Sequence, residues 1–186
     1  MRSIKLPLTN EIIQSLKAGE HVYLSGKLYT ARDAAHVRLL EDLKNASPPI
    51  DIRNEVIYYV GPTPTREGEI IGSAGPTTSG RMDDMTPELL KNGLKGMISK
   101  GKRNVKVIES IVKNNSVYFV AIGGSAALIA KSVKACTVVA YHDLGTEAIR
   151  ELVVENMPVI VAVDCYGNDY YEIGPRDYLG GNHGTE

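Results

Sequence analysis

The chain has 186 residues, of which 43% are hydrophobic and 23% are charged. These fractions are typical of a folded domain with a sizeable core, and they exclude global disorder. The formal net charge is −1, from 21 basic and 22 acidic residues, which excludes a uniformly basic nucleic-acid-binding protein. No apolar run approaches the roughly 18 residues of a membrane span, and the N-terminal segment lacks the apolar core of an export signal. We therefore expect a cytoplasmic protein.

Cysteine is scarce. Cys136 and Cys165 lie 29 positions apart, so the sequence has no CxxC motif and no disulfide framework. A structural zinc site or a cysteine-ligated iron–sulfur cluster needs three or four thiolates, which this chain alone does not supply. His142, Asp143 and Glu147 are three potential metal ligands within six positions, but chance explains that density. We expect no metal ligands here and interpret both cysteines as ordinary buried thiols.

The N-terminal half alternates predicted strands and helices. The hydrophobic pattern predicts strands over residues 21–26, 55–60 and 69–73, and helices over residues 30–44 and 82–92. The first helix is predicted to begin with Thr30 as its N-cap, and Asp33 follows three residues later in an arrangement close to a capping box. Four side chains form its apolar face: Ala35, Leu39, Leu40 and Leu43.

The C-terminal half continues the alternation. Strands are predicted over residues 96–98, 117–122, 136–141, 151–155 and 159–164; helical segments are predicted over residues 104–114, 123–131 and 145–150, and a turn over 166–169. Alternating strands and helices predict an α/β fold in which helices cover a sheet. The strand-rich ends of the chain add a mixed sheet or a second layer. We expect one domain over residues 1–179 and a mobile tail over 180–186.

The stretch GPTTSGR, residues 75–81, is the most informative one for function. Its two glycines permit close backbone approach of a ligand, and the hydroxyl groups of Thr77–Ser79 can donate to an anion. Arg81 adds a planar fork that binds a carboxylate or a phosphate through two hydrogen bonds. The spacing differs from that of a phosphate-binding P-loop. The alternative interpretation is a turn and a capped helix start, with Arg81 on the surface.

The basic loop SKGKR, residues 99–103, is a second candidate because it follows a predicted strand. Six basic residues and no acidic residue lie between Lys91 and Lys106. Ligands of α/β proteins bind beyond the carboxyl ends of strands, so Lys100 and Arg103 are placed to meet an anion. A solvated surface run is the alternative. Nucleic acid is disfavoured by the balanced charge and the lack of interleaved aromatic residues.

The stretch TARDAAHVR, residues 30–38, is the third candidate. Arg32 and His36 are four positions apart, so they share one face of the predicted helix. An arginine in the first turn opposes the helix dipole, and this small penalty hints at another role. The alternative is a surface arginine and a histidine at a packing edge.

These patterns together predict an anion site. Arg32, Arg81 and Lys100 come from three separate segments, and three cations around one pocket suit a dicarboxylate better than a neutral ligand. The GGSAA stretch, residues 123–127, has the form of a strand–glycine–helix anion site, but it lacks the GxGxxG spacing. Tight packing of the helix on its strand explains those small residues better.

Six segments occur in an order that resembles one enzyme family: TARDAAH (30–36), YYVGPTP (58–64), GSAGPTTSGRMD (72–83), KGKR (100–103), FVAIGGSAALIAK (119–131) and LGTEAI (144–149). Over residues 5–172 the chain resembles the β subunit, or C-terminal domain, of iron–sulfur-dependent class I fumarate hydratases. The β subunit of L-tartrate dehydratase is the related sibling. The GPTTSGRMD segment is specific to this group of hydro-lyases.

The resemblance implies a fold, a partner and a reaction. The fold is a swivelling β/β/α domain with mixed sheet layers and helices packed on one face. The partner is an α subunit that binds a 4Fe–4S cluster through three cysteines and leaves one iron open as a Lewis acid. The reaction is the reversible hydration of fumarate to (S)-malate between the two polypeptides. The implied assembly has two α and two β subunits, with no nucleic-acid or membrane partner.

By motif, the resemblance carries family roles onto six residues: the substrate anchor Arg32, the catalytic base Thr77, the catalytic cations Arg81 and Lys100, and the neighbouring substrate contacts Thr78 and Gly101. Removing a proton next to a carboxylate builds up negative charge, which nearby cations stabilise. A threonine hydroxyl is a poor base by itself, so adjacent cations must favour its alkoxide.

Two details bear on the substrate. Fumarate hydratases of the family commonly carry Asn where this chain has Lys102. The arginines of GRMD and KGxR, here Arg81 and Arg103, favour fumarate over L-tartrate. L-tartrate or a methylated fumarate such as mesaconate remains the alternative substrate. A stand-alone anion-binding module without catalysis is the alternative from another class.

Overall fold

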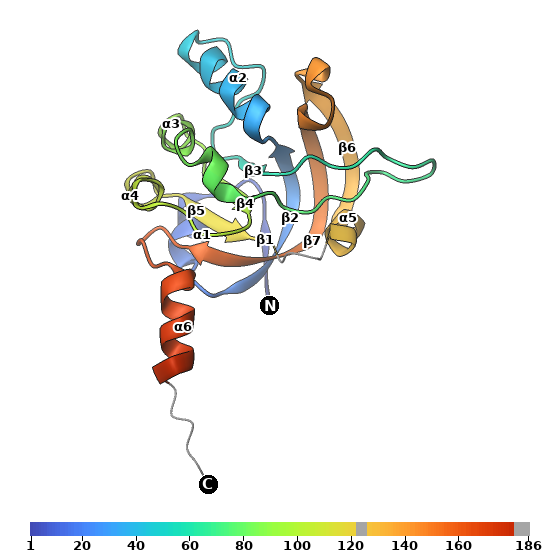
Figure 1. Cartoon of the computed structure of the whole chain (residues 1–186). Coiled ribbons are helices and arrows are strands. Elements are labelled where there is room, and N and C mark those ends of the chain that lie inside the picture. The colour runs from blue at the N-terminus through green and yellow to red at the C-terminus, as the bar shows by residue number, and fades with distance from the viewer. Residues whose placement is uncertain (122–125, 181–186) are drawn as a thin grey trace.

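The computed structural model describes residues 1–121 and 126–180, with side chains described up to residue 176 (Figure 1). The glycine pair at 123–124 and residues 181–186 of the predicted tail lie outside the described residues. The described residues form a seven-stranded mixed sheet in the order β1-β2-β3-β4-β5-β7-β6. The strands are β1 (Arg2–Lys5), β2 (His21–Thr30), β3 (Val56–Tyr58), β4 (Gly96–Ser99), β5 (Val117–Val120), β6 (Val133–Ala140) and β7 (Ile149–Val163).

The sheet closes on itself because β2 has partners on both edges. It pairs in parallel with β3 and antiparallel with β7, and β5 also pairs antiparallel with β7. Strands β2, β3, β4, β5 and β7 therefore form a closed, barrel-like ring, with β1 added to β2 and β6 added to β7. The predicted α/β class with a mixed sheet is confirmed.

Strand β7 is one strand where the sequence predicts two, over residues 151–155 and 159–164. The break in the pattern falls at Asn156, which adopts a φ of +51°. The pairing of β2 with β7 shifts register at the same level, and the Asn156 N–H donates to Ser25 Oγ at 2.9 Å. The irregularity is therefore a local bulge that the neighbouring strand accommodates, and β7 continues past it.

The helices within the described residues are α1 (Asn10–Ser15), α2 (Asp33–Lys44), η1 (Ser79–Met82), α3 (Thr86–Lys91), α4 (Val105–Lys113), α5 (Ala126–Ser132), η2 (His142–Glu147) and α6 (Tyr170–Gly180), where η denotes 3-10 helix. Helices α2, α3 and α4 lie along one side of the sheet (Figure 1). They pack on the outward side chains of β3, β4 and β5: Ile57, Met97 and Tyr118. The expected one-sided packing is incomplete, because Ile13 of α1 and Ile129 of α5 join the inner cluster.

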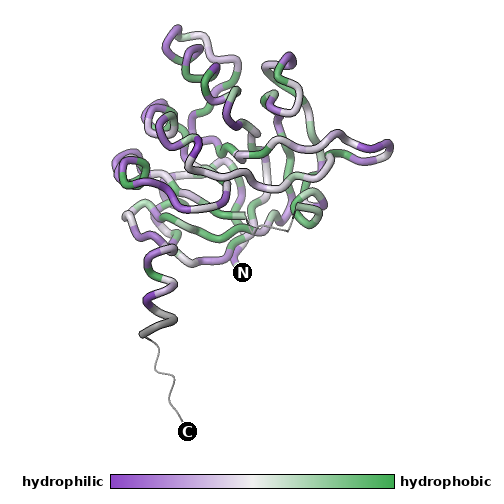
Figure 2. Tube along the Cα trace, in the orientation of Figure 1, coloured by the Kyte–Doolittle hydropathy of each residue, from purple (hydrophilic) through white to green (hydrophobic). Residues whose placement is uncertain are grey.

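The alternation along the strands explains the two apolar clusters. Val56 and Tyr58 point into the ring, whereas Ile57 between them packs against the outer helices. Figure 2 shows hydrophobic segments along the strands and hydrophilic residues at the tip of the long segment between β3 and η1. Among the described residues, no helix is both long and apolar enough to cross a membrane.

Three local predictions are wrong. Thr30 is the last residue of β2 rather than the N-cap of α2; its Oγ1 accepts the Arg150 N–H at 3.0 Å, and Arg32 is the cap residue. Residues 69–73 form bends and irregular coil rather than a strand. The predicted helix over 82–92 is divided into η1 and the shorter α3.

The remaining predicted strands and the helices over 30–44 and 104–114 correspond to observed elements within a few residues. Strand β1 and helices α1 and α6 have no counterpart among the predictions. Both helices are marginal in sequence terms, since α1 has only six residues and α6 contains Pro175.

Candidate functional site

The candidate residues gather where three neighbouring parallel strands end. β2 ends at Thr30, two residues before Arg32; β3 ends just before Tyr59; and β4 ends just before Lys100. Because β2 pairs in parallel with β3, and β3 with β4, these carboxyl ends lie at one edge of the sheet. Such an edge is the usual ligand site of α/β folds. We call Arg32, Thr77, Thr78, Arg81, Lys100 and Gly101 the rim.

The GPTTSGR segment lies across the ends of β3 and β4 and is held by backbone hydrogen bonds. The Thr77 N–H and its Oγ1 hydroxyl both donate to the Tyr59 carbonyl, at 2.8 and 3.0 Å. The Lys100 N–H donates to the Thr77 carbonyl at 3.2 Å, and the Ser79 N–H donates to the Lys100 carbonyl at 2.9 Å. Thr78 and Lys100 therefore form an isolated parallel bridge, and the predicted base and lysine are direct neighbours.

Arg81 projects from η1 to the first turn of α2, where it meets Asp33. Its Nε and Nη2 donate to the two Asp33 carboxylate oxygens at 2.9 and 3.0 Å, in a bidentate pair. Partial burial opposes ionisation of Asp33, but the hydrogen bonds and charge of Arg81 outweigh it, and the pKa of Asp33 lies below its usual value. The Arg81 side chain remains 51% exposed, so its free edge faces outward.

Arg32 is held at the other side of the same helix turn. Its guanidinium packs against the backbone of Gly61, where an added Cβ would lie 2.6 Å from the Arg32 Cζ. Its Nε lies 2.9 Å from Glu147 Oε1, an ion-pair contact. The second oxygen of Glu147 accepts the Ala34 N–H at 2.9 Å, so Glu147 caps helix α2 in place of the predicted threonine.

Lys100 and Gly101 complete the rim. Lys100 is exposed, and within the described residues its ammonium has neither an ion-pair nor a hydrogen-bond partner. Gly101 adopts a φ of +91°, a conformation that favours glycine. The Gly101 N–H donates to the Tyr171 hydroxyl oxygen at 3.1 Å, and the Gly101 carbonyl accepts from the Tyr118 hydroxyl at 2.9 Å. The loop that presents Lys100 is thus anchored from both α6 and β5.

A buried layer of polar side chains lies beneath the rim, and we define it as His36, Tyr59, Asp83 and Arg103. The Arg103 side chain is 0% exposed; its Nε lies 2.9 Å from Asp83 Oδ1, and its guanidinium lies 5.5 Å from the Tyr59 ring centroid. The prediction that Arg103 meets an anion is therefore wrong. Arg103 forms an ion pair with Asp83 instead, because a buried charge needs a partner of opposite charge.

His36 belongs to the same layer and is fully buried rather than at a packing edge. Its ring contacts Tyr59 edge-to-face at a centroid distance of 4.7 Å, and its Nδ1 lies 3.2 Å from the Arg32 carbonyl. Burial, opposed by that hydrogen bond, lowers the pKa of His36 to about 4. The imidazole is therefore neutral at pH 7 and supports the helix turn that carries Arg32.

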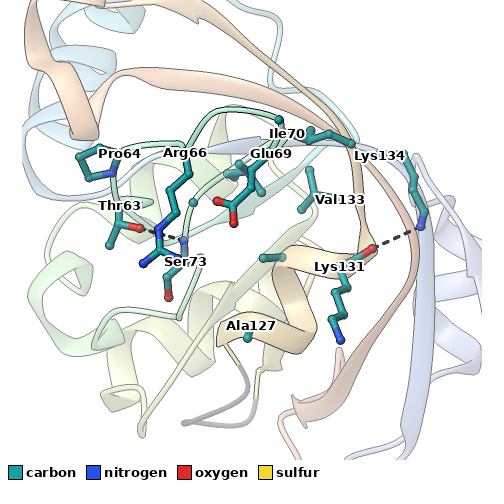
Figure 3. A pocket seen from close by; sticks show the side chains of 14 residues that line it. Thr63, Pro64, Arg66, Glu69, Ile70, Ser73, Ala127, Lys131, Val133 and Lys134 are labelled. Atoms are coloured by element: carbon teal, nitrogen blue, oxygen red, sulfur yellow. Dashed lines mark hydrogen bonds between the residues drawn. The ribbon is translucent and has the colours of Figure 1, made fainter.

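A cavity of about 580 Å³ lies away from the rim, between the segment after β3 and the α5–β6 region (Figure 3). Arg66, Glu69, Lys131 and Lys134 line it together with apolar side chains such as Val133. None of the rim cations lines it.

The cysteines show no sign of metal binding. Cys165 is buried and Cys136 is half-buried, and burial raises the pKa of both thiols. Thiolates are the ligand form, so this environment disfavours ligation. No group of three or more potential ligands capable of holding a metal occurs among residues 1–121 and 126–176, the grouping of His142, Asp143 and Glu147 included.

Sequence reasoning missed the acids that hold the arginines. Asp33 was expected to support a helix start, and Glu147 was dismissed as a chance metal ligand; the structure places them on Arg81 and Arg32. The TARDAAH and LGTEAI segments contained both residues. The two pairings require the fold, because Asp33 lies 48 positions from Arg81 and Glu147 lies 115 positions from Arg32.

Comparison with known proteins gives a consistent result. The family described as "Fumarase C-terminus" matches residues 1–174. A protein of Methanocaldococcus jannaschii named "Putative L(+)-tartrate dehydratase subunit beta" is 41% identical over 89% of this chain and 88% of its own length. "Fumarate hydratase 2" of Leishmania major is 38% identical over 91% of the chain, and "Fumarate hydratase class I, aerobic" of Escherichia coli K12 is 40% identical over 80%. The chain spans 31% and 28% of these two hydratases.

Proposed function

Because the chain belongs to the Fumarase C-terminus family, we propose that it is the β subunit of an iron–sulfur hydro-lyase that hydrates fumarate to (S)-malate. The observation that carries the proposal is the rim, where three cations and a threonine from separate motifs meet at one sheet edge. The hydratase relatives are about three times as long as this chain, which supports a partner α subunit for the remainder. We further propose a cytoplasmic assembly of two α and two β subunits.

The geometry supports a division of roles within the rim. Arg32 and Arg81 each present guanidinium N–H groups to an incoming carboxylate, and Lys100, whose backbone is bridged to Thr78, adds an ammonium without an acidic partner among the described residues. In the dehydration direction, the Thr77 alkoxide acts as the base that takes the proton from the carbon next to a carboxylate; in hydration, the Thr77 hydroxyl returns that proton to the carbon. Negative charge then develops on that carboxylate, where Arg81 and Lys100 stabilise it. Thr78 and Gly101 line the same edge.

Thr77 needs help to act as a base. Its hydroxyl donates to the Tyr59 carbonyl, which cannot take the proton, so that proton must pass to solvent before the Thr77 alkoxide can act as the base. A threonine alkoxide forms only in a strongly cationic environment, and Lys100 is the nearest cation along the bridge between the two segments. The fixed backbone geometry keeps this pair together without reorganisation.

This chain's own residues do not fit an iron–sulfur cluster. Its two thiols have raised pKa values, and a cluster needs three or four thiolates. We therefore assign the 4Fe–4S cluster to the partner α subunit. In this proposal residues 1–179 form one swivelling β/β/α domain that brings the rim to that partner.

L-tartrate is the second candidate substrate, and a specific observation favours it. The relative that matches this chain over nearly its whole length is named as a tartrate dehydratase subunit. Mesaconate belongs to the same alternative. Fumarate remains our assignment because the GRMD and KGxR motifs, with Arg81 and Arg103, are both present; identities of 38–41% do not separate the two substrates.

The test is reconstitution of an anaerobic complex with a three-cysteine α subunit and an intact cluster. We expect hydration of fumarate in the complex and none by the β chain alone, with L-tartrate and mesaconate assayed in parallel. Turnover of L-tartrate alone would select the second candidate. Tight dicarboxylate binding by the free chain, without turnover by the complex, would instead show a stand-alone anion-binding module.

A further inference from the structure

Two carboxylates, Asp33 and Glu147, lie against the two arginines of the rim. Both meet at the first turn of α2, where Arg32 is the N-cap residue and Asp33 the first helical residue. Acidic groups at this end of a helix are favoured by its dipole, so part of their stability is independent of the arginines. The N-terminal end of α2 therefore favours both carboxylates at the positions where they meet the arginines.

Asp33 controls the direction of Arg81. A guanidinium has five N–H donors in a planar fork, and Asp33 occupies the edge formed by Nε and Nη2. The remaining edge, which includes Nη1, is left for another anion. A bidentate contact of this kind fixes the plane of the guanidinium as well as its position.

Glu147 controls Arg32 in a different way. One of its oxygens lies 2.9 Å from Arg32 Nε, while the other accepts the Ala34 N–H. The Ala34 N–H therefore holds the Glu147 carboxylate at the helix end independently of its contact with Arg32. Gly61 supports the guanidinium from its face, so Arg32 is confined between a backbone surface and a carboxylate.

We propose that Asp33 and Glu147 are positioning residues that set the directions of Arg81 and Arg32, and thereby the spacing of the two cations that receive a dicarboxylate. This inference rests on the proposed function. The two acids also offset two of the three positive charges of the rim, which leaves Lys100, bridged to Thr78, as the rim cation without an acidic partner among the described residues. In this arrangement Lys100 supplies an uncompensated charge, and the two arginines supply directed hydrogen bonds.

The two acids are expected to leave different kinetic signatures because they act through different arginines. Asp33→Asn replaces one acceptor oxygen by an NH₂ group that faces an Arg81 donor. We expect kcat of the complex to fall by roughly tenfold to a hundredfold, the cost of one charged hydrogen bond. Glu147→Gln cannot satisfy both Arg32 and Ala34, so we expect KM to rise by roughly the same factor with kcat nearly kept.

The chain provides a matched control. Arg38 Nη1 of α2 lies 2.8 Å from both carboxylate oxygens of Asp143, which is in η2 together with Glu147. Asp143→Asn removes the same kind of ion pair between the same two elements, at a distance from the rim. We expect kcat and KM to be unchanged. Asp33→Glu, which retains two acceptor oxygens, should recover part of the lost kcat.

The outcomes separate this inference from the proposed function. A wild-type complex that turns over neither fumarate nor L-tartrate overturns both. An active wild type with Asp33→Asn and Glu147→Gln indistinguishable from Asp143→Asn overturns only the positioning roles. Equal changes in kcat and KM in both variants, accompanied by a lower unfolding midpoint, would show a purely structural effect on α2 and also overturn them. A fall in kcat for Asp33→Asn together with a rise in KM for Glu147→Gln supports the proposal.

Discussion

Arg81 and Arg103 come from neighbouring motifs and look equivalent in the sequence, yet the fold gives them opposite environments. The Arg81 side chain is 51% exposed and reaches Asp33 across the rim, whereas the Arg103 side chain is 0% exposed and pairs with Asp83. Both carry a charge at pH 7, and both have an acidic partner. The effect of the acidic partner depends on burial: Asp83 offsets the cost of burying the Arg103 charge, whereas Asp33 orients the exposed guanidinium of Arg81.

The difference follows from where each segment meets the sheet. The rim lies beyond the strand ends, where side chains face solvent, and the buried layer lies between the outer sheet face and helices α2 to α4. Asp83 also accepts the N–H of Asn104 at 2.8 Å, the cap residue of α4. The buried layer therefore joins the segment that carries Arg81 to the loop that carries Lys100. The buried layer thus lies beneath the rim and holds in place the segments that carry the rim residues.

The largest expected effect is on stability, in the buried layer. Arg103→Ala leaves Asp83 buried without its partner, and we expect the free energy of unfolding to fall by about 3–5 kcal/mol. Urea denaturation of the β chain measures this. Arg53→Ala is the control, because Arg53 pairs with Asp51 on the exposed surface, and it should leave stability unchanged. Equal stability of the two variants would contradict the separation of layer and rim.

The rim should show the reverse pattern, with large effects on rate and small effects on stability. Arg81→Ala and Lys100→Ala each remove a cation that stabilises developing negative charge, and we expect turnover of the complex to fall roughly 10²–10³-fold. Both side chains are exposed, so unfolding should be little affected. Lys106→Ala on α4 serves as an exposed-lysine control. Near-normal turnover in both rim variants would refute the assigned site.

A pH effect of intermediate size is expected from His36. Burial lowers its pKa from 6.5 to about 4, so the unfolded chain binds a proton that the folded chain does not. Stability should be full above about pH 6.5 and should decline as the pH falls toward 4, by about 1.4 kcal/mol per pH unit. Asp33, whose pKa is lowered from 3.8, contributes its stabilisation throughout that window and loses it only as the pH falls below about 3.8.

The measurement is the unfolding free energy at several pH values between 7 and 4.5. His36→Gln removes the titrating group, and its stability should depend much less on pH over this window, whatever its absolute value. A slope that persists in His36→Gln would assign the titration to another group and would remove His36 from the buried layer's energetics.

The sequence predicts the residues of the rim from local motifs but does not predict the buried layer, for a physical reason. Arg32, Thr77, Arg81 and Lys100 sit in short motifs of glycine, hydroxyl and basic residues, and those local patterns persist in the fold. The pairing of Arg103 with Asp83 depends on the packing of α3 and α4 on the sheet, which no local pattern encodes. The failed N-cap at Thr30 has the same origin, because a distant Glu147 replaces the local cap.

A smaller effect is expected where the backbone makes room for a rim side chain. Gly61→Ala would place a Cβ 2.6 Å from the Arg32 Cζ, so the guanidinium must move away from its position against the backbone. We expect KM of the complex to rise by about tenfold, with unfolding nearly unchanged. Gly174→Ala in α6 meets only Tyr170, at an ordinary contact distance of 3.4 Å, and serves as the control. An unchanged KM would show that Arg32 is free to move.

The smallest expected effect concerns Lys102, the position at which the sequence resemblance leads us to expect asparagine. Its ammonium lies 2.6 Å from Glu172 Oε1 on α6, and the hydrogen bond to that carboxylate raises the pKa of Lys102 and lowers that of Glu172. Both groups are fully solvated, so water and salt screen the pair. Lys102→Asn should therefore leave turnover and unfolding unchanged at low and at high salt. A loss of turnover in this variant would place Lys102 in the rim, and the basic loop would then present two cations where the structure presents one.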